Sequence, residues 1–109
     1  MTHTDTELEK EIIEKGLTAP RVTLEGLHKK IIDVEIVKHT TKGGGILRWA
    51  ILTMENGFAV TGRPSAAVSV ENDNAEIGEK IAVQNAQNEV WALEGYLLKE
   101  QLFNKSTQP

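Results

Sequence analysis

The sequence predicts a single α+β domain, in which an antiparallel sheet of three strands or slightly more lies between N-terminal helices and a long C-terminal helical segment. Three observations predict this class: helical spacing of apolar residues near both ends, a period of two in the middle, and an Asn-Gly pair between two β-rich runs. A length of 109 residues fits one domain. We expect that domain to span residues 1–109, with an ordered core over about 5–103 and polar tails at both ends.

Two helices are expected before the sheet. The first covers residues 5–15 and ends at Gly16, a residue type that is common just after a helix. Thr23 is placed to cap a second, short helix that runs to about Ile31.

The middle of the chain predicts strands. Apolar and polar residues alternate from Ile32 to about His39, as in a half-buried strand. The run 46–54 is apolar at both parities, which is typical of a central strand covered on two faces, for example by a helix and by another subunit. Asn56-Gly57 predicts a type I′ turn into a strand over 58–61, because that turn needs positive φ at both central residues. A short strand is expected at 66–68.

Helical spacing returns in the last third of the chain. The polar turn at 71–74 contains Asn and Asp residues, one of which is expected to cap the helix that follows. The helical pattern continues to about Phe103, and we expect a bend near 91–95.

Composition excludes several classes of function. Twelve Lys and Arg against sixteen Asp and Glu give a net charge of −4 and a pI near 5.4, whereas proteins that bind DNA or RNA polymers usually carry a basic stripe. No apolar run approaches the roughly 20 residues that span a bilayer, and the N-terminus has no signal pattern, so we expect a cytoplasmic protein. The chain has no cysteine, and its three histidines have no partner at ligand spacing. We therefore expect no metal, no cofactor and, because no acid–base dyad is evident, no enzymatic activity.

Candidate ligand-binding residues are chosen by their chemistry. Arg21, Arg48 and Arg63 lie beside chain breaks or on a strand, and a guanidinium suits a phosphate or a carboxylate. The simpler interpretation of each arginine is an intramolecular ion pair. Asn85 lies in an otherwise apolar helix, so its amide needs a partner, either a ligand or a neighbouring backbone. The other candidates offer donors or a stacking face, namely Thr23, Thr61, Phe58, Trp91 and Tyr96, of which the last two are more simply core or oligomer contacts.

Five stretches carry a family resemblance: GLTAPRVT (16–23), NGFAVTG (56–62), EIGEKIA (76–82), Asn85-Ala86, and WALEGYLL (91–98). In this order, and over about residues 11–103, they resemble the N-four/Sf-six family of small phage proteins, which are non-virion gene products. The sequence departs from the family's usual pattern at four positions, where Ala67, Val70, Asp73 and Ala92 replace Cys, Pro, Phe and Pro.

A more distant similarity concerns architecture and setting. A strand hairpin followed by C-terminal helices is similar to the phage anti-Thoeris sponges, which hold cyclic ADP-ribose isomers or cyclic oligonucleotides without catalysis at subunit interfaces. This implies a phage accessory protein that sequesters a small anionic nucleotide-type signal of host defence, in the host cytoplasm, as a dimer or higher oligomer. The alternative is a phage protein-interaction factor that inhibits or recruits a host protein through an exposed hydrophobic face. The sequence leaves open the ligand, the subunit count and whether a site lies within one subunit or between subunits.

Overall fold

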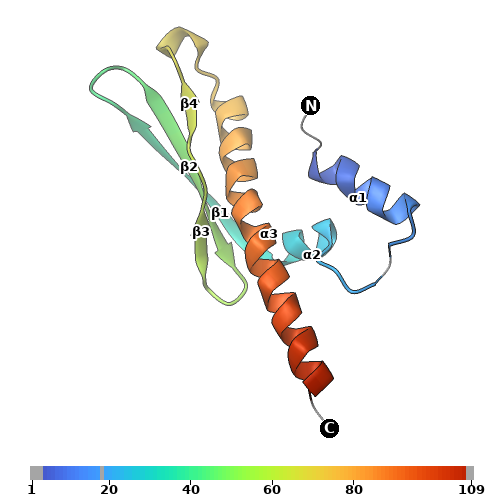
Figure 1. Cartoon of the computed structure of the whole chain (residues 1–109). Helices are drawn as coiled ribbons and strands as arrows, with labels where there is room; N and C mark the ends of the chain where they lie inside the picture. The colour runs from blue at the N-terminus through green and yellow to red at the C-terminus, as the bar shows by residue number, and fades with distance from the viewer. Residues whose placement is uncertain (1–3, 18, 108–109) are drawn as a thin grey trace.

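The computed structural model describes residues 4–17 and 19–107 (Figure 1). It has the predicted α+β class: an antiparallel sheet, helices before it and a long helix after it. In chain order, the elements are α1 (Asp5–Glu14), α2 (Leu24–Lys30), β1 (Ile31–Thr40), β2 (Ile46–Met54), β3 (Ala59–Thr61), β4 (Ser65–Ala67), the 3-10 turn η1 (Val70–Asn72) and α3 (Ala75–Thr107).

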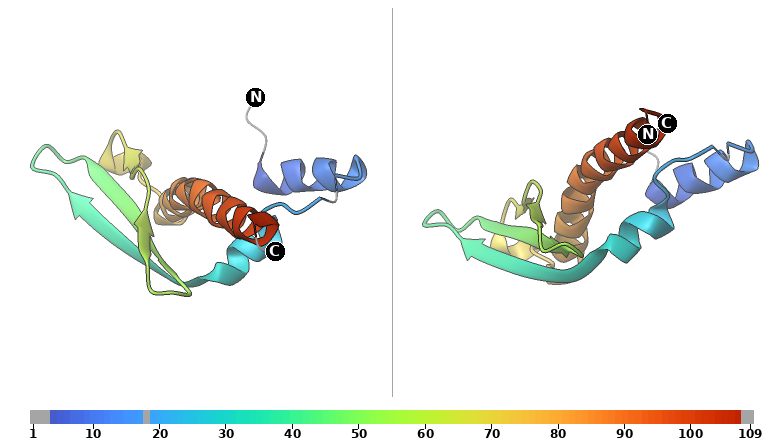
Figure 2. Two further views of the ribbon diagram at one scale, coloured as in Figure 1. Left: turned by 60° about the horizontal axis from the view of Figure 1, so that its bottom comes forward. Right: turned by 90° about the horizontal axis from the view of Figure 1, so that it is seen from below.

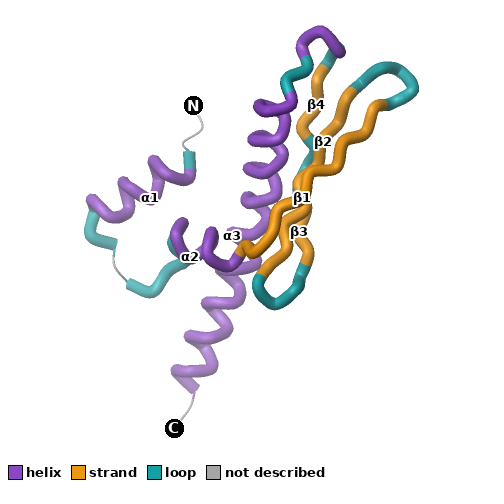
Figure 3. The backbone as a smooth tube through the Cα atoms, turned by 180° about the vertical axis from the view of Figure 1, so that it is seen from behind, coloured by secondary structure: helices purple, strands orange, loops and turns teal. Residues whose placement is uncertain are grey.

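The sheet is built around β2. On one side β2 pairs with β1, with one register shift between Ile31 and Asp33. On the other side its two ends pair with the short strands β3 and β4, and all pairs are antiparallel (Figure 3). The register places Ala50 opposite Ile36 and Leu52 opposite Val60. β3 and β4 therefore form one interrupted edge, and the interruption covers residues 62–64.

Helix α3 covers one face of the sheet. Alternate residues of β2, among them Ala50 and Leu52, are buried beneath the helix, as the period of two requires. Helix α3 contributes Ala82, Ala86 and Val90 to this core, spaced four residues apart on one face of the helix. The small alanine side chains let the helix lie close to the sheet. Figure 2 shows α1, α2 and α3 on the same side of the sheet.

The two N-terminal helices have clear end signals. Thr4 and Glu7 form a capping box at the start of α1, and Thr23 caps α2 by accepting a hydrogen bond from the Gly26 N–H at 2.9 Å. Helix α1 contains no buried residue, so polar contacts with the rest of the chain contribute much of its docking.

The Asn56-Gly57 turn differs from the predicted type. Only Gly57 has a positive φ, of 89°, and no described residue other than glycine has one, so a type I′ turn is ruled out. The Gly57 N–H donates to the Met54 carbonyl at 2.8 Å, and the Met54 N–H donates to the Phe58 carbonyl at 2.8 Å. These bonds define a three-residue loop in which glycine takes the left-handed position after the turn. The hairpin was correctly predicted, and its turn was not.

Helix α3 also differs from the prediction. It continues as one α-helix to Thr107, past the expected end at Phe103. The helix is unbroken through 91–95, where a bend was expected, because this segment contains no proline and a single glycine costs a helix only about 1 kcal/mol relative to alanine. The start of α3 was predicted correctly, because the Asn74 side chain accepts a hydrogen bond from the Ile77 N–H at 3.0 Å.

Predicted strand bounds agree closely with the structure. The strand expected at 46–54 has those bounds, the one expected at 32–39 is one residue longer at each end, and the short strand lies at Ser65–Ala67. Residues 1–3 and 108–109 of the expected polar tails lie outside the described residues.

Candidate functional site

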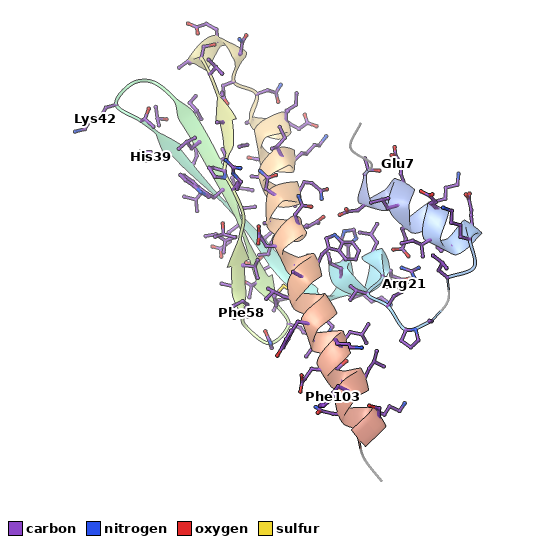
Figure 4. All side chains as sticks on the ribbon, viewed as in Figure 1. Glu7, Arg21, His39, Lys42, Phe58 and Phe103 are labelled. Carbon is purple, nitrogen blue, oxygen red and sulfur yellow. The ribbon has the colours of Figure 1, made fainter. Side chains whose placement is uncertain are left out.

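Arg21 and Thr23 lie where the loop from α1 enters α2. Figure 4 labels Arg21 in this loop. Its guanidinium donates to Glu9 on α1, and the other Glu9 oxygen accepts a hydrogen bond from the Leu24 N–H at 3.0 Å. The hydrogen bond from Arg21, followed by that from Leu24, lowers the pKa of Glu9. Arg21 therefore has a carboxylate partner within the chain, as its simpler interpretation predicted, and it joins α1 to α2.

Arg48 is buried in β2, with 4% of its surface exposed. Both of its terminal nitrogens donate to Asp73, one to each carboxylate oxygen, with the Nη2–Oδ2 distance at 2.9 Å. This fork geometry lowers the pKa of Asp73, chiefly through the hydrogen bonds from Arg48. The pair connects the central strand to the segment before α3, and it occupies the face of Arg48 that a ligand phosphate would need.

Thr61 and Arg63 flank Gly62 at the break between β3 and β4, and Asn85 of α3 contacts this break. The Asn85 side-chain amide donates to the Arg63 carbonyl at 3.0 Å, and the Thr61 hydroxyl donates to the Ala50 carbonyl at 2.9 Å. Asn85 therefore bonds a neighbouring backbone, which was one of its two expected roles. The Arg63 side chain is exposed.

The interrupted edge requires glycine at residue 62. A Cβ built on Gly62 would lie 2.4 Å from both the carbonyl carbon and the oxygen of Asn85 in α3. At the break between β3 and β4, the edge of the sheet therefore lies directly against the backbone of α3.

The three aromatic candidates lie apart. The Trp91 indole N–H donates to Asp5 of α1 at 3.1 Å, and its ring packs against the core. Phe58 lies at the end of the β2–β3 hairpin (Figure 4), with 58% of its surface exposed. Tyr96 lies on α3, with 75% of its surface exposed. Trp91 therefore has the core role that its simpler interpretation predicted.

The structure does not bring the nine candidate residues into one pocket. A cavity of about 170 Å³ is lined by Arg21 and Thr23, together with Lys30 and Glu94. Both of its cations have carboxylate partners, because Arg21 bonds Glu9 and the Lys30 ammonium lies 3.1 Å from Glu94. Pockets for nucleotide-sized ligands usually measure about 300–1,000 Å³. The cavity is smaller than that range.

Comparison with known proteins identifies the family. The model of the phage protein (N4 Gp49/phage Sf6 gene 66) family matches residues 17–102. The chain belongs to this family. No curated protein and no solved structure matches the chain.

The family match covers the sheet and most of α3 of this phage protein, but it does not include α1. All nine candidate residues lie within it. Among residues 4–17 and 19–107 of the phage protein, no helix combines the length and the hydropathy needed to cross a membrane. Within the same residues, no three His, Asp or Glu side chains gather as possible ligands of a metal ion.

Sequence reasoning did not name as a site the apolar face of the sheet that lies opposite α3 in this phage protein. The side chains of Leu47, Trp49 and Ile51 alternate with the buried residues of β2 and face away from α3, and Val37 of β1 lies directly opposite Trp49. No described helix covers this side of the sheet (Figure 2). We call these four residues the open face. A signal for this face was present in the sequence, because the apolar residues of 46–54 at both parities predicted that both faces of the strand are covered. Among the described residues, α3 covers one of these faces and no helix covers the other.

Proposed function

We propose that the protein is a non-enzymatic phage accessory factor that binds a host protein through the open face of its sheet. The observation that carries this proposal is an apolar strand face that no described helix covers. In addition, Arg21 and Arg48 are paired with carboxylates of the chain itself. A soluble monomer seldom leaves such a surface without a partner. The proposed setting is the host cytoplasm during infection.

The chemistry of the open face indicates the kind of partner. Trp49 lies at its centre, and tryptophan is among the residues that most often dominate a protein interface. Asp33 and Glu35 lie on the same face of β1, next to this apolar centre, and the chain as a whole is acidic. The matching surface is therefore apolar in the middle and basic at its rim.

Substitution of Trp49 tests the proposal. Threonine is suitable because it keeps a high β-propensity while it removes the large apolar ring. A host protein captured by the purified wild-type chain should bind Trp49→Thr at least about thirtyfold more weakly, which corresponds to the loss of an interface hot spot. Phe58→Ser is the matched control, because Phe58 is an exposed aromatic residue outside the open face. Equal binding by the two variants would contradict the proposal.

Sequestration of a nucleotide-derived immune signal is the second candidate function. The feature that favours it is the cavity beside Arg21, Thr23 and Lys30, which has two cations and a helix cap at its wall. A bound phosphate would have to displace Glu9 or Glu94 from these cations. The test is to incubate the protein with a panel of cyclic oligonucleotides and ADP-ribose isomers and then to heat-denature it. Depletion followed by release of intact ligand would support sequestration, release of a product would indicate an enzyme, and no depletion favours the interaction factor.

A further inference from the structure

Strand β1 leaves its outer edge unpaired. It pairs with β2 along one side, and within residues 4–17 and 19–107 no strand pairs with the other side (Figures 1 and 2). In the loop to β2, the Thr41 N–H donates to the Gly45 carbonyl at 2.8 Å. The backbone groups of Thr41 therefore point toward the β2 side, which fixes the direction of the others along β1. Backbone groups alternate in direction along a strand, so those of Val34, Ile36, Lys38 and Thr40 point outward.

This edge has the features of a strand that pairs with another chain. It is ten residues long, and it contains neither proline nor glycine. Its pairing with β2 is regular from Asp33 to Thr40, after a register shift between Ile31 and Asp33. Ile32 and Val34 are 62% and 46% exposed. A long edge with apolar side chains and unpaired backbone groups is a template for strand addition.

The charges of β1 favour an identical partner in antiparallel orientation. Asp33 and Glu35 lie in its first half, and Lys38 and His39 lie in its second half. Antiparallel pairing of two copies brings the acidic half of each against the basic half of the other, whereas parallel pairing aligns like charges.

We propose that two copies of this chain pair through β1, antiparallel, about a two-fold axis at Ile36 or Val37. An axis at Ile36 puts Asp33 directly opposite His39 of the second copy, and an axis at Val37 puts Glu35 there. The result is one sheet that runs through both copies, with the same surface used on each side. This inference does not depend on the proposed function, because it uses the strand edge and leaves the open face accessible.

A groove beside β1 adds a second complementary feature. It has a volume of about 620 Å³, and Val34 and Ile36 form part of its floor. Its wall on α3 carries Glu76, Glu79 and Lys80, an excess of one negative charge. Lys38 of the second copy lies opposite Val34 for one axis and opposite Ile36 for the other, so in both registers its ammonium approaches this acidic wall.

Cysteine cross-linking tests the interface directly, because the chain has no cysteine of its own. A residue on a two-fold axis meets its own copy, with Cβ atoms about 4.5–5.5 Å apart, and only a small adjustment brings them within disulfide range. Under mild oxidation, either Ile36→Cys or Val37→Cys should give a covalent dimer, according to the axis. Ala66→Cys, exposed on the opposite edge of the sheet, is the control. The proposal is overturned if neither variant cross-links faster than this control.

Proline substitution provides an independent measurement. Lys38→Pro removes an outward N–H and leaves the hydrogen bonds to β2, so β1 should still form. Lys38→Thr removes the same charge but keeps the N–H. The wild-type chain should be a dimer in solution by light scattering. The Kd of the Lys38→Pro dimer should be at least about tenfold higher than that of the Lys38→Thr dimer, because the two-fold axis doubles each lost hydrogen bond. A folded wild-type chain that stays monomeric at every concentration, or equal Kd values for the two variants, overturns the proposal.

Discussion

Two glycines illustrate how the local environment of a single residue decides its role. Gly62 lies against the backbone of α3, where an added Cβ would lie 2.4 Å from Asn85, whereas a Cβ on Gly95 in the same helix meets no atom within 4 Å. Gly62→Ala should therefore lower the free energy of unfolding by about 1–3 kcal/mol through overpacking. Gly95→Ala should raise it by about 0.5–1 kcal/mol, because alanine is the better helix former. Denaturant unfolding of the two variants measures both effects, and a destabilised Gly95→Ala would contradict this account of the helix.

The Arg48–Asp73 pair makes stability depend on pH at the residue scale. Arg48 lowers the pKa of Asp73 in the folded chain, so the stabilisation is fully present above the ordinary aspartate pKa of about 3.9 and is lost as the pH falls through the lower folded value. Asp73→Asn should destabilise the protein at neutral pH and flatten its loss of stability below about pH 4. Glu25→Gln, in the exposed pair with Lys29, should change little. Thermal melts from neutral to acidic pH provide the measurement, and an unchanged acid slope in Asp73→Asn would show that the pair does not carry this dependence.

At the scale of elements, helix α1 is held to the rest of the protein by polar contacts. Asp5 accepts hydrogen bonds from Trp91 and from Gln84, each at 3.1 Å, and Glu9 binds Arg21, while no residue of α1 is buried. The double variant Asp5→Ala/Glu9→Ala should release α1 and leave the sheet and α3 intact. In hydrogen exchange, amides of α1 should lose protection while those of β2 keep it; the control is Glu14→Ala, on an exposed part of the same helix. Loss of protection throughout β2 would show instead that α1 is part of the folding core.

An element could be predicted when the interactions that determine it lie between residues that are close in sequence. The bounds of β2 and the start of α3 follow from neighbouring residues and were predicted. The signals were the apolar run 46–54 and the capping residues in 71–74, among which Asn74 is the cap. The turn at Asn56-Gly57 was not, because two-residue and three-residue loops share this sequence signal and the strand register decides between them.

The partners of the candidate residues could not be predicted, because they are distant in sequence. Arg48 and Asp73 are separated by 25 positions, and Trp91 and Asp5 by 86. The sequence limited each arginine to a ligand or a carboxylate, and only the fold identifies the carboxylate for Arg21 and Arg48. The open face could not be predicted for the same reason. Apolar residues on both sides of a strand predict that both sides are covered, but they do not say which side is covered by the chain itself and which by another molecule.

The whole molecule is elongated, with extents of 61 × 32 × 18 Å. Helix α3, at about 1.5 Å per residue over 33 residues, accounts for roughly 50 Å of the longest dimension. This shape leaves two surfaces of the sheet accessible, the outer edge of β1 and the open face. We propose a second copy as the partner of the edge and a different protein as the partner of the open face, so the proposed dimer would present two open faces side by side.

The central claim is that Trp49 lies at a surface that binds a host protein. Its most direct test is a photo-cross-linking amino acid placed at residue 49 in the phage protein during infection, with the same amino acid at residue 58 in a parallel experiment. The account predicts that position 49 cross-links to one host protein that position 58 does not reach, and that this protein carries a basic surface. Cross-links from position 49 only to another copy of the chain, or to the same proteins as position 58, would contradict it.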